Sequence, residues 1–314
     1  MNISKHIILK TACVLIALLF AFNIDVFSQD TSQDYLSQGY TVYGKLGNGV
    51  PNAEKLGWKV GIQSYTFHKF TFFEAIDLTA ALGLNYIEGV AGMKLCPESD
   101  EKFGHGMSQE SKDKLKKKLE DAGIEHISYF QWLSGNKEGF EEVVKFAKEM
   151  GLMIVTDPKR VPSGGVNPQF YDEILTKYGV TMVFTNHRKP ISYWNPKFAL
   201  EDTKDRSQYL GASVDIGHYM RDGFDPLPIV KDFIKAGKMF HFHMRDVSKL
   251  GPEGIDVPLG GGQGKIKEIL TELHKNDIQP FIMLEYEHDF YNPMLELIPS
   301  VKYINDVCGE LLDK

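Results

Sequence analysis

The chain has 314 residues, of which 43% are hydrophobic, 25% charged and 12% aromatic, and its formal net charge is −7. This is an ordinary globular composition, which excludes a disordered, collagen-like or disulfide-dense chain. An acidic chain gains nothing from attraction to phosphates, which argues against a nucleic-acid partner.

The first 28 residues are predicted to be a signal peptide. Lys5 and Lys10 accompany the apolar run 11–22 (TACVLIALLFAF), which has the length of a signal-peptide core and is short for a membrane span. We therefore expect a periplasmic or secreted protein with no stable membrane insertion after cleavage. An uncleaved N-terminal anchor is the alternative. The two mature cysteines, Cys96 and Cys308, are expected to be free and buried.

Residues 29–57 are polar and irregular, and we interpret them as an N-terminal extension. After them, short apolar runs alternate with amphipathic segments. The apolar runs predict eight strands, at 60–66, 86–90, 126–131, 153–157, 182–186, 212–216, 240–244 and 281–286. Helices are expected between the strands, at 72–81, 108–121, 137–150, 169–178, 197–209, 227–236 and 264–276. Several end at a glycine just before the next strand, namely Gly83, Gly123, Gly151, Gly179 and Gly211.

Strictly alternating strands and helices predict a parallel sheet. Eight such units over about 250 residues fit one closed (β/α)8 TIM barrel, here spanning 58–314, better than a doubly wound sheet. No Gly-x-Gly-x-x-Gly follows the first strand, which argues against a dinucleotide-binding fold.

The ends of three strands carry candidate metal ligands, because catalytic groups of such barrels cluster at the carboxyl ends of the strands. Side chains alternate along a strand, so Asp215, between Val214 and Ile216, is predicted to face the lumen. His243 and Glu285 are predicted to do the same on the seventh and eighth strands. The alternatives are a helix-capping role for Asp215, a core role for the histidine and a salt bridge for Glu285.

Oxygen and nitrogen ligands without a thiolate favour one divalent ion of the borderline kind, Mn²⁺, Co²⁺, Ni²⁺ or Zn²⁺. His187 on the fifth strand is a candidate fourth ligand, or else a loop residue. Other residues are candidates for substrate binding at the mouth: His68, Trp132, His241 (one layer deeper) and Arg245. Glu88, Tyr65, Gln131 and Asp157 are weaker candidates there, and the glycine run 260–262 is expected to form a mobile loop.

At these residues the chain resembles the xylose-isomerase-like superfamily of sugar isomerases and epimerases, over about residues 58–312. The resemblance rests on VGIQSYTF near the first strand, SVDIGH at 213–218, HFHMRD at 241–246, VPLGGGQG at 257–264 and LEYEHD at 284–289. It implies one divalent metal held by Glu, Asp, His and Glu from four strand ends. Asp215 matches the Asp, His243 the His and Glu285 the last Glu, while His218 resembles a substrate-contacting histidine.

The chain departs from the family pattern at Thr185, because the usual motif is Glu-Asn-His and here it is Thr185-Asn186-His187. In epimerases of this family the Glu is also one of two acid/base groups, so its loss argues against two-base epimerisation. The metal then keeps three protein ligands plus water, or recruits His187.

The stretches FTNHRKPISYWNP and DIGHYMRDGFDP resemble a subgroup found in secreted carbohydrate-degrading systems. That resemblance implies elimination, or hydration of an enone, on keto sugars. The leading hypothesis is therefore a metal-dependent lyase or hydratase acting on a 3-keto sugar, with Glu285, His218 and Lys159 as catalytic residues. A sugar isomerase or epimerase and a non-catalytic sugar-binding protein remain open alternatives, as does homo-oligomer formation. An acidic, exported chain argues against a DNA endonuclease of the same fold.

Overall fold

The computed structural model describes residues 45–133, 137–158, 167–191 and 193–314, and the predicted signal peptide lies outside these ranges. Across the described ranges, no helix is both long enough and apolar enough to cross a membrane.

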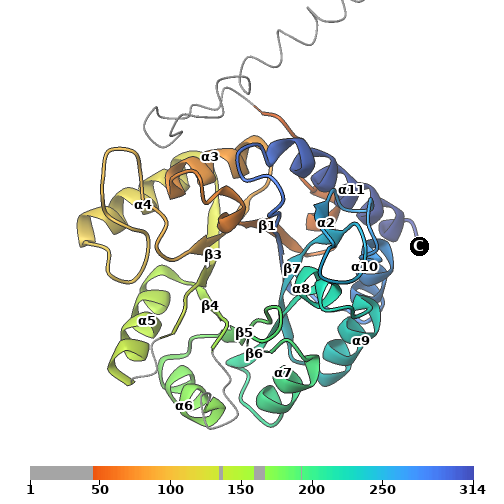
Figure 1. Cartoon of the computed structure of the whole chain (residues 1–314). Coiled ribbons are helices and arrows are strands. Elements are labelled where there is room, and N and C mark those ends of the chain that lie inside the picture. Colours follow the sequence, from red (N-terminus) through yellow and green to blue (C-terminus); the bar gives the residue numbers. More distant parts are fainter. Residues whose placement is uncertain (1–44, 134–136, 159–166, 192) are drawn as a thin grey trace, which may run out of the picture.

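Eight parallel strands close into a barrel in the order β1-β10-β7-β6-β5-β4-β3-β2, which confirms the predicted single (β/α)8 barrel (Figure 1). The barrel strands are β1 Lys59–Gln63, β2 Tyr86–Val90, β3 Glu125–Phe130, β4 Met153–Thr156, β5 Met182–Phe184, β6 Leu210–Asp215, β7 Met239–Met244 and β10 Phe281–Leu284. Two further short strands, β8 Asp246–Val247 and β9 Asp256–Val257, form an antiparallel hairpin outside the barrel.

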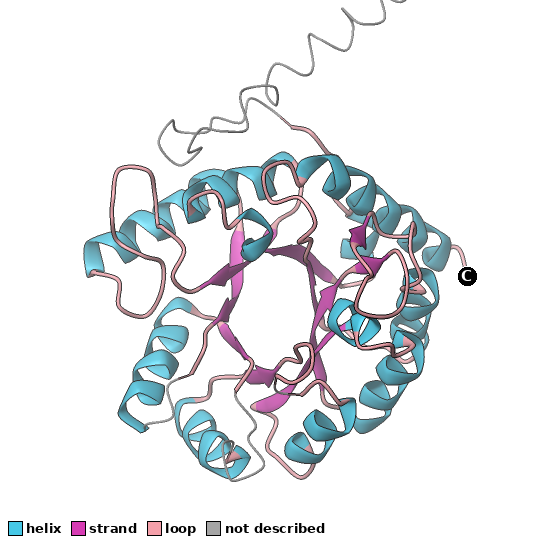
Figure 2. Cartoon of the chain, in the orientation of Figure 1, coloured by secondary structure: helices cyan, strands magenta, loops and turns pink. Residues whose placement is uncertain are grey.

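Helices surround the ring of strands on the outside, as Figure 2 shows. They are α2 Pro51–Lys55, α3 Phe72–Ala81, α4 Gln109–Ala122, α5 Lys137–Met150, α6 Pro168–Tyr178, α7 Pro196–Thr203, α8 Ile216–Arg221, α9 Pro226–Ala236, α10 Ile266–Lys275 and α11 Met294–Leu312, with a 3-10 helix, η2, at Ser64–Phe67.

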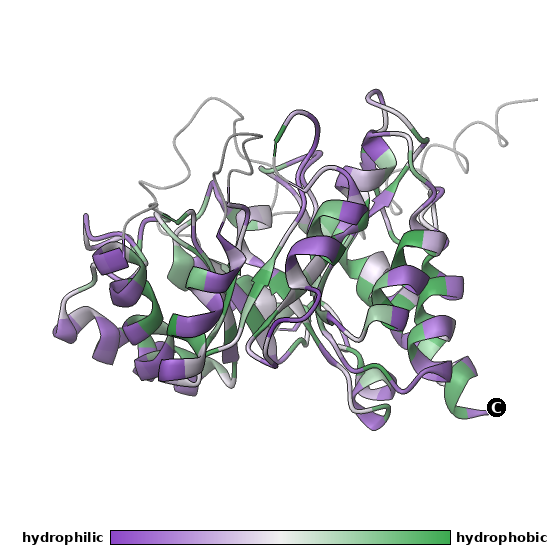
Figure 3. Ribbon diagram, turned by 90° about the horizontal axis from the view of Figure 1, so that it is seen from below, coloured by the Kyte–Doolittle hydropathy of each residue, from purple (hydrophilic) through white to green (hydrophobic). Residues whose placement is uncertain are grey.

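Helical periodicity explains how the outer layer packs on the barrel. In α10, Ile266, Ile269, Leu270 and Leu273 recur at helical spacing, and all four are buried. Hydrophobic and hydrophilic stretches accordingly alternate along the ribbon of the surrounding helices (Figure 3). The amino end of α3 is closed by a capping box, in which Thr71 and Glu74 each bind a backbone N–H of the other.

Three local differences from the predicted elements have physical causes. β1 ends at Gln63 rather than at residue 66, because the Gln63 side chain accepts a hydrogen bond from the Tyr65 N–H and starts η2. Ile216 belongs to α8 rather than to β6, because Asp215 caps that helix. Gly211 was wrongly expected to end a helix. It lies within β6, where an added Cβ would come within 2.3 Å of the Phe240 ring.

The described part of the predicted extension, 45–57, packs against the barrel. α2 contacts α11, and the Asn52 side chain donates to the Asn305 carbonyl oxygen while its backbone N–H donates to Asn305 Oδ1. The cysteines in the described ranges, Cys96 and Cys308, are both free and buried, as expected.

The glycine-rich loop after β9 wraps around one carboxylate. Asp246 accepts hydrogen bonds from the backbone N–H groups of Gly260, Gly262 and Gly264, at 2.9, 3.0 and 2.7 Å. An added Cβ on Gly262 would lie 2.4 Å from Asp246 Oδ1, so the close approach requires glycine there. The loop that the sequence suggested was mobile is thus bound along its backbone to a buried side chain.

Candidate metal centre

A pocket of about 310 Å³ opens at the carboxyl end of the barrel strands. Seven of the residues predicted for the site or its mouth line it: Tyr65, Trp132, His187, Asp215, His218, His243 and Glu285. The strand-end rule therefore brings residues from six different barrel strands or the loops after them to one place.

Three of these residues form a candidate metal-ligand set. His243 Nδ1 lies 3.6 Å from Glu285 Oε2 and 3.9 Å from Asp215 Oδ2, and all three side chains are buried. Bonds of about 2.1 Å at tetrahedral or octahedral angles separate two ligand atoms by about 3.0–3.5 Å. The two distances from His243 exceed this range by at most a few tenths of an ångström, and one ligand atom of each residue lies within 4.8 Å of the others. This nitrogen-and-oxygen set fits a divalent ion of the kind the sequence predicted.

The strand register produces this arrangement. Asp215 pairs with His243 across β6 and β7, and His243 pairs with Met283 across β7 and β10. Glu285 follows β10 two positions beyond Met283, so its side chain faces the same way. The side chain of Asn186 holds the end of β6 in place, because it accepts from the Asp215 N–H at 2.8 Å and donates to the Asp215 carbonyl at 2.9 Å.

Asp215 also caps a helix, so the structural alternative for this residue is confirmed alongside its place in the candidate set. Its Oδ1 accepts a hydrogen bond from the His218 N–H at 2.8 Å, at the start of α8. Its Oδ2 remains directed at the pocket side. Burial alone would raise the pKa of Asp215, but the neighbouring His218, Arg245 and His243 lower it, so the carboxylate is ionised.

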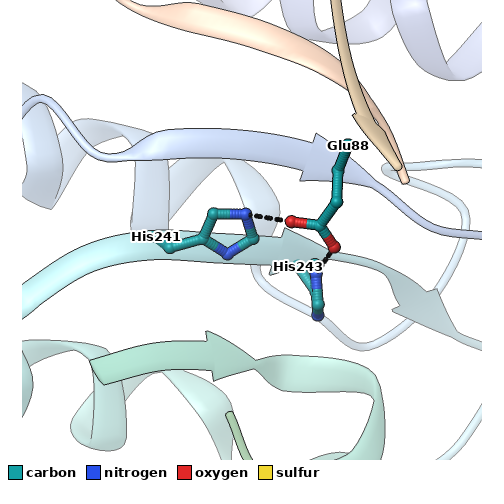
Figure 4. Close-up of side chains that lie close together, drawn as sticks. All are labelled: Glu88, His241 and His243. Carbon is teal, nitrogen blue, oxygen red and sulfur yellow. Dashed lines mark hydrogen bonds and ion pairs between the residues drawn. The ribbon is translucent and has the colours of Figure 1, made fainter. Parts of the chain in front are cut away.

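A second set of polar side chains lies one layer deeper (Figure 4). Glu88 Oε1 lies 2.8 Å from His243 Nε2, and Glu88 Oε2 lies 2.8 Å from His241 Nε2. An N-to-O distance of 2.8 Å is that of a hydrogen bond and is too short for an ion between the two atoms. Although these three residues could also be considered as ligands, the spacing indicates protons rather than a metal.

The sequence considered Glu88 only as a weak candidate at the mouth, whereas the structure encloses it completely inside the barrel. Its position on β2 with Gly89 and Ile87 as neighbours was the available signal for an inward side chain. His241 is likewise fully buried, and its Nδ1 lies 2.9 Å from Ser213 Oγ. His241 does not line the pocket, so it offers no surface to a substrate there, and its substrate-binding role stays a prediction.

Arg245 lies under the pocket as a buried cation. Its Nη2 lies 2.7 Å from Asp256 Oδ2 and 2.7 Å from Glu287 Oε2. Its Nη1 lies 3.6 Å from Asp215 Oδ2 and 3.7 Å from Glu285 Oε1, and has no hydrogen-bond partner among the described residues. Arg245 is therefore placed to balance the negative charge of these four carboxylates. It lies outside the pocket lining, where the sequence had expected a substrate contact.

Two stacked histidines border the site. The rings of His187 and His218 lie 4.1 Å apart at 28°. Burial lowers the pKa of His218 to about 3, so its imidazole is neutral at physiological pH, and its Nδ1 has no hydrogen-bond partner within the described ranges. His187 lines the pocket but falls outside the set of mutually close ligand atoms, so a metal-binding role for it stays a prediction.

Glu285 is the carboxyl group in the pocket lining whose pKa is raised. Burial raises its pKa well above the ordinary value, against the opposing charge of Arg245. A carboxyl group with a raised pKa is suited to take up and return a proton at physiological pH.

The remaining predicted residues lie at the edge or outside the described ranges. Trp132 is 51% exposed and its ring meets Phe130 edge-on at 4.9 Å, so it forms an open aromatic wall. His68 stacks on Tyr65 and meets Phe290, and it lies behind those two residues rather than in the lining. Lys159 is outside the residues that the structure describes.

Solved structures with the same fold have low sequence identity to this chain. A putative uncharacterized protein from Parabacteroides distasonis is 24% identical, with a TM-score of 0.61 over 79% of this chain and 98% of that chain. The probable 3-DHS dehydratase AsbF from Bacillus anthracis is 15% identical, with a TM-score of 0.58 over 79% and 98%. The 3-keto-D-glucoside 4-epimerase YcjR from E. coli is 12% identical, with a TM-score of 0.55 over 82% and 100%.

No curated protein sequence matches the chain. The sequence profile of one family, described as Xylose isomerase-like TIM barrel, matches residues 76–306, which extend from α3 into α11. The chain therefore belongs to the xylose isomerase-like TIM barrel family.

Proposed function

We propose that this protein is a divalent-metal-dependent carbohydrate enzyme that acts next to a carbonyl group, as a lyase or hydratase on a 3-keto sugar. The observation that carries the proposal is the convergence of Asp215, His243 Nδ1 and Glu285 at the floor of the pocket, with ligand spacing suited to one ion. The relatives named above include a sugar epimerase and a dehydratase, which supports carbonyl chemistry of this class.

Asp215, His243 and Glu285 would hold the ion, with Mn²⁺, Co²⁺, Ni²⁺ or Zn²⁺ as candidates. A divalent ion supplies stabilisation of the negative charge that develops on a carbonyl oxygen when a neighbouring proton is removed. Because the three ligand side chains are buried, electrostatic interactions at this place are stronger than in bulk water.

Glu285 would move the proton. An oxygen of Glu285 that does not bind the ion can take a proton from the carbon next to the carbonyl and deliver it to a leaving hydroxyl or alkoxide. His218 is neutral and has a free ring nitrogen, so it can accept a hydrogen bond from a sugar hydroxyl. Trp132 offers an exposed ring face for stacking on the sugar.

A sugar isomerase or epimerase is the second candidate. An epimerase that uses two bases would require one acid/base group on each face of the reacting carbon. Besides Glu285, the stacked pair of His187 and His218 in the pocket lining is a candidate for the second group. A lyase or hydratase needs one such group, which matches Glu285, the carboxyl group in the pocket lining whose pKa is raised.

We also propose that the protein is exported, on the basis of residues 1–28. In the periplasm or outside the cell, its partner would be a small, unphosphorylated carbohydrate. Mass spectrometry of the protein expressed with its full leader tests this, since a mature chain that begins at Gln29 is expected and an intact Met1 would contradict it.

Elemental analysis of the purified mature protein and of Asp215→Ala tests the metal centre. About one equivalent of a transition metal in the wild type and its loss in the variant are expected. The metal-loaded enzyme is then incubated with 3-keto sugars, and products are followed by NMR. Elimination or hydration supports the lyase or hydratase, and a change of configuration alone supports the epimerase.

Glu285→Gln, assayed at a metal concentration that saturates the variant, tests the acid/base role of Glu285. We expect turnover to fall by about 10²–10⁴-fold, the usual effect of removing a general acid/base. Near-native turnover in this variant would remove Glu285 from the mechanism. If the wild type binds keto sugars but turns none of them over with any of the four metals, the protein is a sugar-binding protein and not an enzyme of this class.

A further inference from the structure

Glu88 is an enclosed carboxylate at the centre of the barrel, and the mechanism above does not use it. Its exposed fraction is 0%, and it is absent from the lining of the pocket. It therefore cannot reach a substrate that occupies the pocket. Its contacts are all with barrel side chains, and one of them is the candidate ligand His243.

We propose that Glu88 is a positioning residue, which fixes the ring of His243 so that its Nδ1 lone pair faces Asp215 and Glu285. This proposal rests on the proposed metal centre. An ionised carboxylate can only accept hydrogen bonds, so the His243 Nε2 that lies 2.8 Å from Glu88 Oε1 must carry the proton. An imidazole that binds an ion as a neutral ligand then has only Nδ1 free to do so.

The geometry of the two nitrogens supports this assignment. The Nε2 side of His243 meets an oxygen at hydrogen-bond distance, whereas the Nδ1 side faces two carboxylate oxygens at 3.6 and 3.9 Å. The close contact is the one that a proton fills, and the wider space is the one that an ion fills. A carboxylate behind a metal-bound histidine is a recurrent way to orient the ring and strengthen it as a ligand.

Glu88 is itself held by neighbours on two other strands, β3 and β7. Ser128 Oγ on β3 donates to its Oε2 at 2.7 Å, and His241 Nε2 on β7 lies 2.8 Å from the same oxygen. His241 is in turn in contact with Ser213 Oγ on β6 at 2.9 Å. A buried charge persists only when such partners satisfy it, so the enclosed carboxylate is a rigid reference point for His243.

Glu88→Gln tests the proposal with almost no change in shape. The amide offers one oxygen and one NH₂ group, so at least one of the two histidines meets a donor in place of an acceptor. If His243 meets the donor, its proton must move to Nδ1, which then cannot bind an ion. We expect the affinity for Zn²⁺ or Mn²⁺, measured by competition with a chelator, to fall about 10–100-fold.

Glu74→Gln is the matched control. Glu74 is 4% exposed and accepts hydrogen bonds in the capping box of α3, outside the barrel. It undergoes the same buried carboxylate-to-amide change, so it accounts for any general loss of stability. We expect its metal affinity to stay within about threefold of the wild type.

The tautomer of His243, which is the ring nitrogen that carries its proton, is a second measurement. A Glu88 that only stabilised the fold would not determine this tautomer. In ¹⁵N-labelled wild type loaded with Zn²⁺, His243 should carry its proton on Nε2 and bind through Nδ1. A zinc-bound ring that carries its proton on Nδ1 overturns the proposal, even if Glu88→Gln does not fold. The proposal is also overturned if Glu88→Gln folds and keeps both the metal affinity of the wild type and the proton on His243 Nε2.

Failure of this proposal can be distinguished from failure of the proposed function. If the wild type binds an ion and the tautomer is the wrong one, Glu88 loses its role and the metal centre stands. If the wild type binds no ion, the metal-dependent function falls. The metal-free spectrum still decides the positioning of the ring, because a slowly exchanging, low-field Nε2–H of His243 supports it and the absence of that signal overturns it.

Discussion

His243 on β7 and His126 on β3 are both enclosed, with 2% and 7% of their surfaces exposed, yet they lie in different kinds of interior. His243 is in the lumen of the barrel, surrounded by the carboxylates of Glu88, Glu285 and Asp215. Burial alone would lower its pKa, but these charges raise it to about 9. His126 is in the layer between barrel and helices, where burial lowers its pKa to about 4.

The surroundings of His126 contain aromatic rings in place of charges. The rings of Phe103 and Phe72 lie 5.4 and 5.5 Å away, and neither ring nitrogen has a hydrogen-bond partner in the described part of the chain. The pairing of β2 with β3 shifts register between Ile87 and Glu88, which lets His126 face the helices while Ser128 faces the lumen. The comparison teaches that partners, more than burial, decide whether a histidine of this barrel is charged.

The largest expected effect tests whether the charged lumen depends on its buried cation. Arg245→Met leaves Glu287 without the guanidinium that lies 2.7 Å from it and takes the nearby cation from Asp215 and Glu285, while Asp256 keeps its ion pair with Arg221. We expect the free energy of unfolding, measured in urea, to fall by about 3–5 kcal/mol, because uncompensated buried charges are strongly destabilising.

Arg245→Lys keeps the charge and should lose less than Arg245→Met. Lys302→Ala removes an exposed ion pair with Asp306 on α11 and is the surface control, with an expected change below about 1 kcal/mol. An Arg245→Met variant as stable as the wild type would show that the lumen tolerates its carboxylates without this partner.

The second effect concerns the charge on His243. In the metal-free protein the pKa of about 9 leaves the imidazole protonated at neutral pH, and an ion must displace that proton. The loss of the His243 proton alone should therefore make metal affinity increase by up to about tenfold with each unit that the pH is raised toward 9, and this contribution levels off above pH 9. Competition titrations at several pH values, corrected for the chelator, measure this slope. An affinity independent of pH would mean that His243 is neutral before the ion binds.

The fold and the three clustered candidate ligands could be predicted because their signals are local. Alternation along a strand and the strand-end rule placed Asp215, His243 and Glu285 together from a few residues each. Glu88 could not be ranked in this way, because its partner His243 is 155 positions away and meets it only when the barrel closes. The burial of Arg245 had the same obstacle, since it depends on Asp256 in the hairpin after β7.

Some helices escaped prediction for a different reason. α8 has only six residues, and its start depends on a cap from Asp215 that also looks like a strand residue. α11 carries Pro299 within its first turns, a residue that usually argues against a helix. Both helices are held by tertiary packing, which a periodicity argument cannot weigh.

The third effect tests the prediction that the buried His126 is neutral in the folded protein. The pKa of His126 is lower in the folded protein, about 4, than the ordinary 6.5, so the unfolded chain binds a proton more readily. The contribution of His126 to stability is thus complete above pH 6.5 and is lost as the pH falls toward 4. Relative to its value at pH 7, the free energy of unfolding at pH 5 should drop by about 2 kcal/mol less in His126→Phe than in the wild type.

Urea unfolding of both proteins at pH 7 and pH 5 measures this difference. Any misfit of the larger phenyl ring affects both pH values equally and cancels. His218 also has a lowered pKa, but it titrates in both proteins and cancels as well. Identical pH dependence in the two proteins would show that His126 is protonated or partnered in the folded state.

The smallest effect separates a pocket hydroxyl from a buried one on the neighbouring strand. Thr185 and Thr156 are 2% and 0% exposed, and neither hydroxyl has a hydrogen-bond partner among the described residues. Only Thr185 lines the pocket. Replacing either by valine removes an unsatisfied polar group, so both variants should be as stable as the wild type or more stable by about 1 kcal/mol.

Function should distinguish the two variants. If the Thr185 hydroxyl finds its partner in a bound sugar, Thr185→Val should weaken substrate binding by about 3–10-fold, which corresponds to one neutral hydrogen bond. Thr156→Val should leave binding unchanged, because Thr156 does not line the pocket. Equal sugar affinity in both variants would mean that the unpaired hydroxyl of Thr185 is a packing feature of the strand end, like that of Thr156, and that substrate recognition rests on the histidines and the aromatic wall.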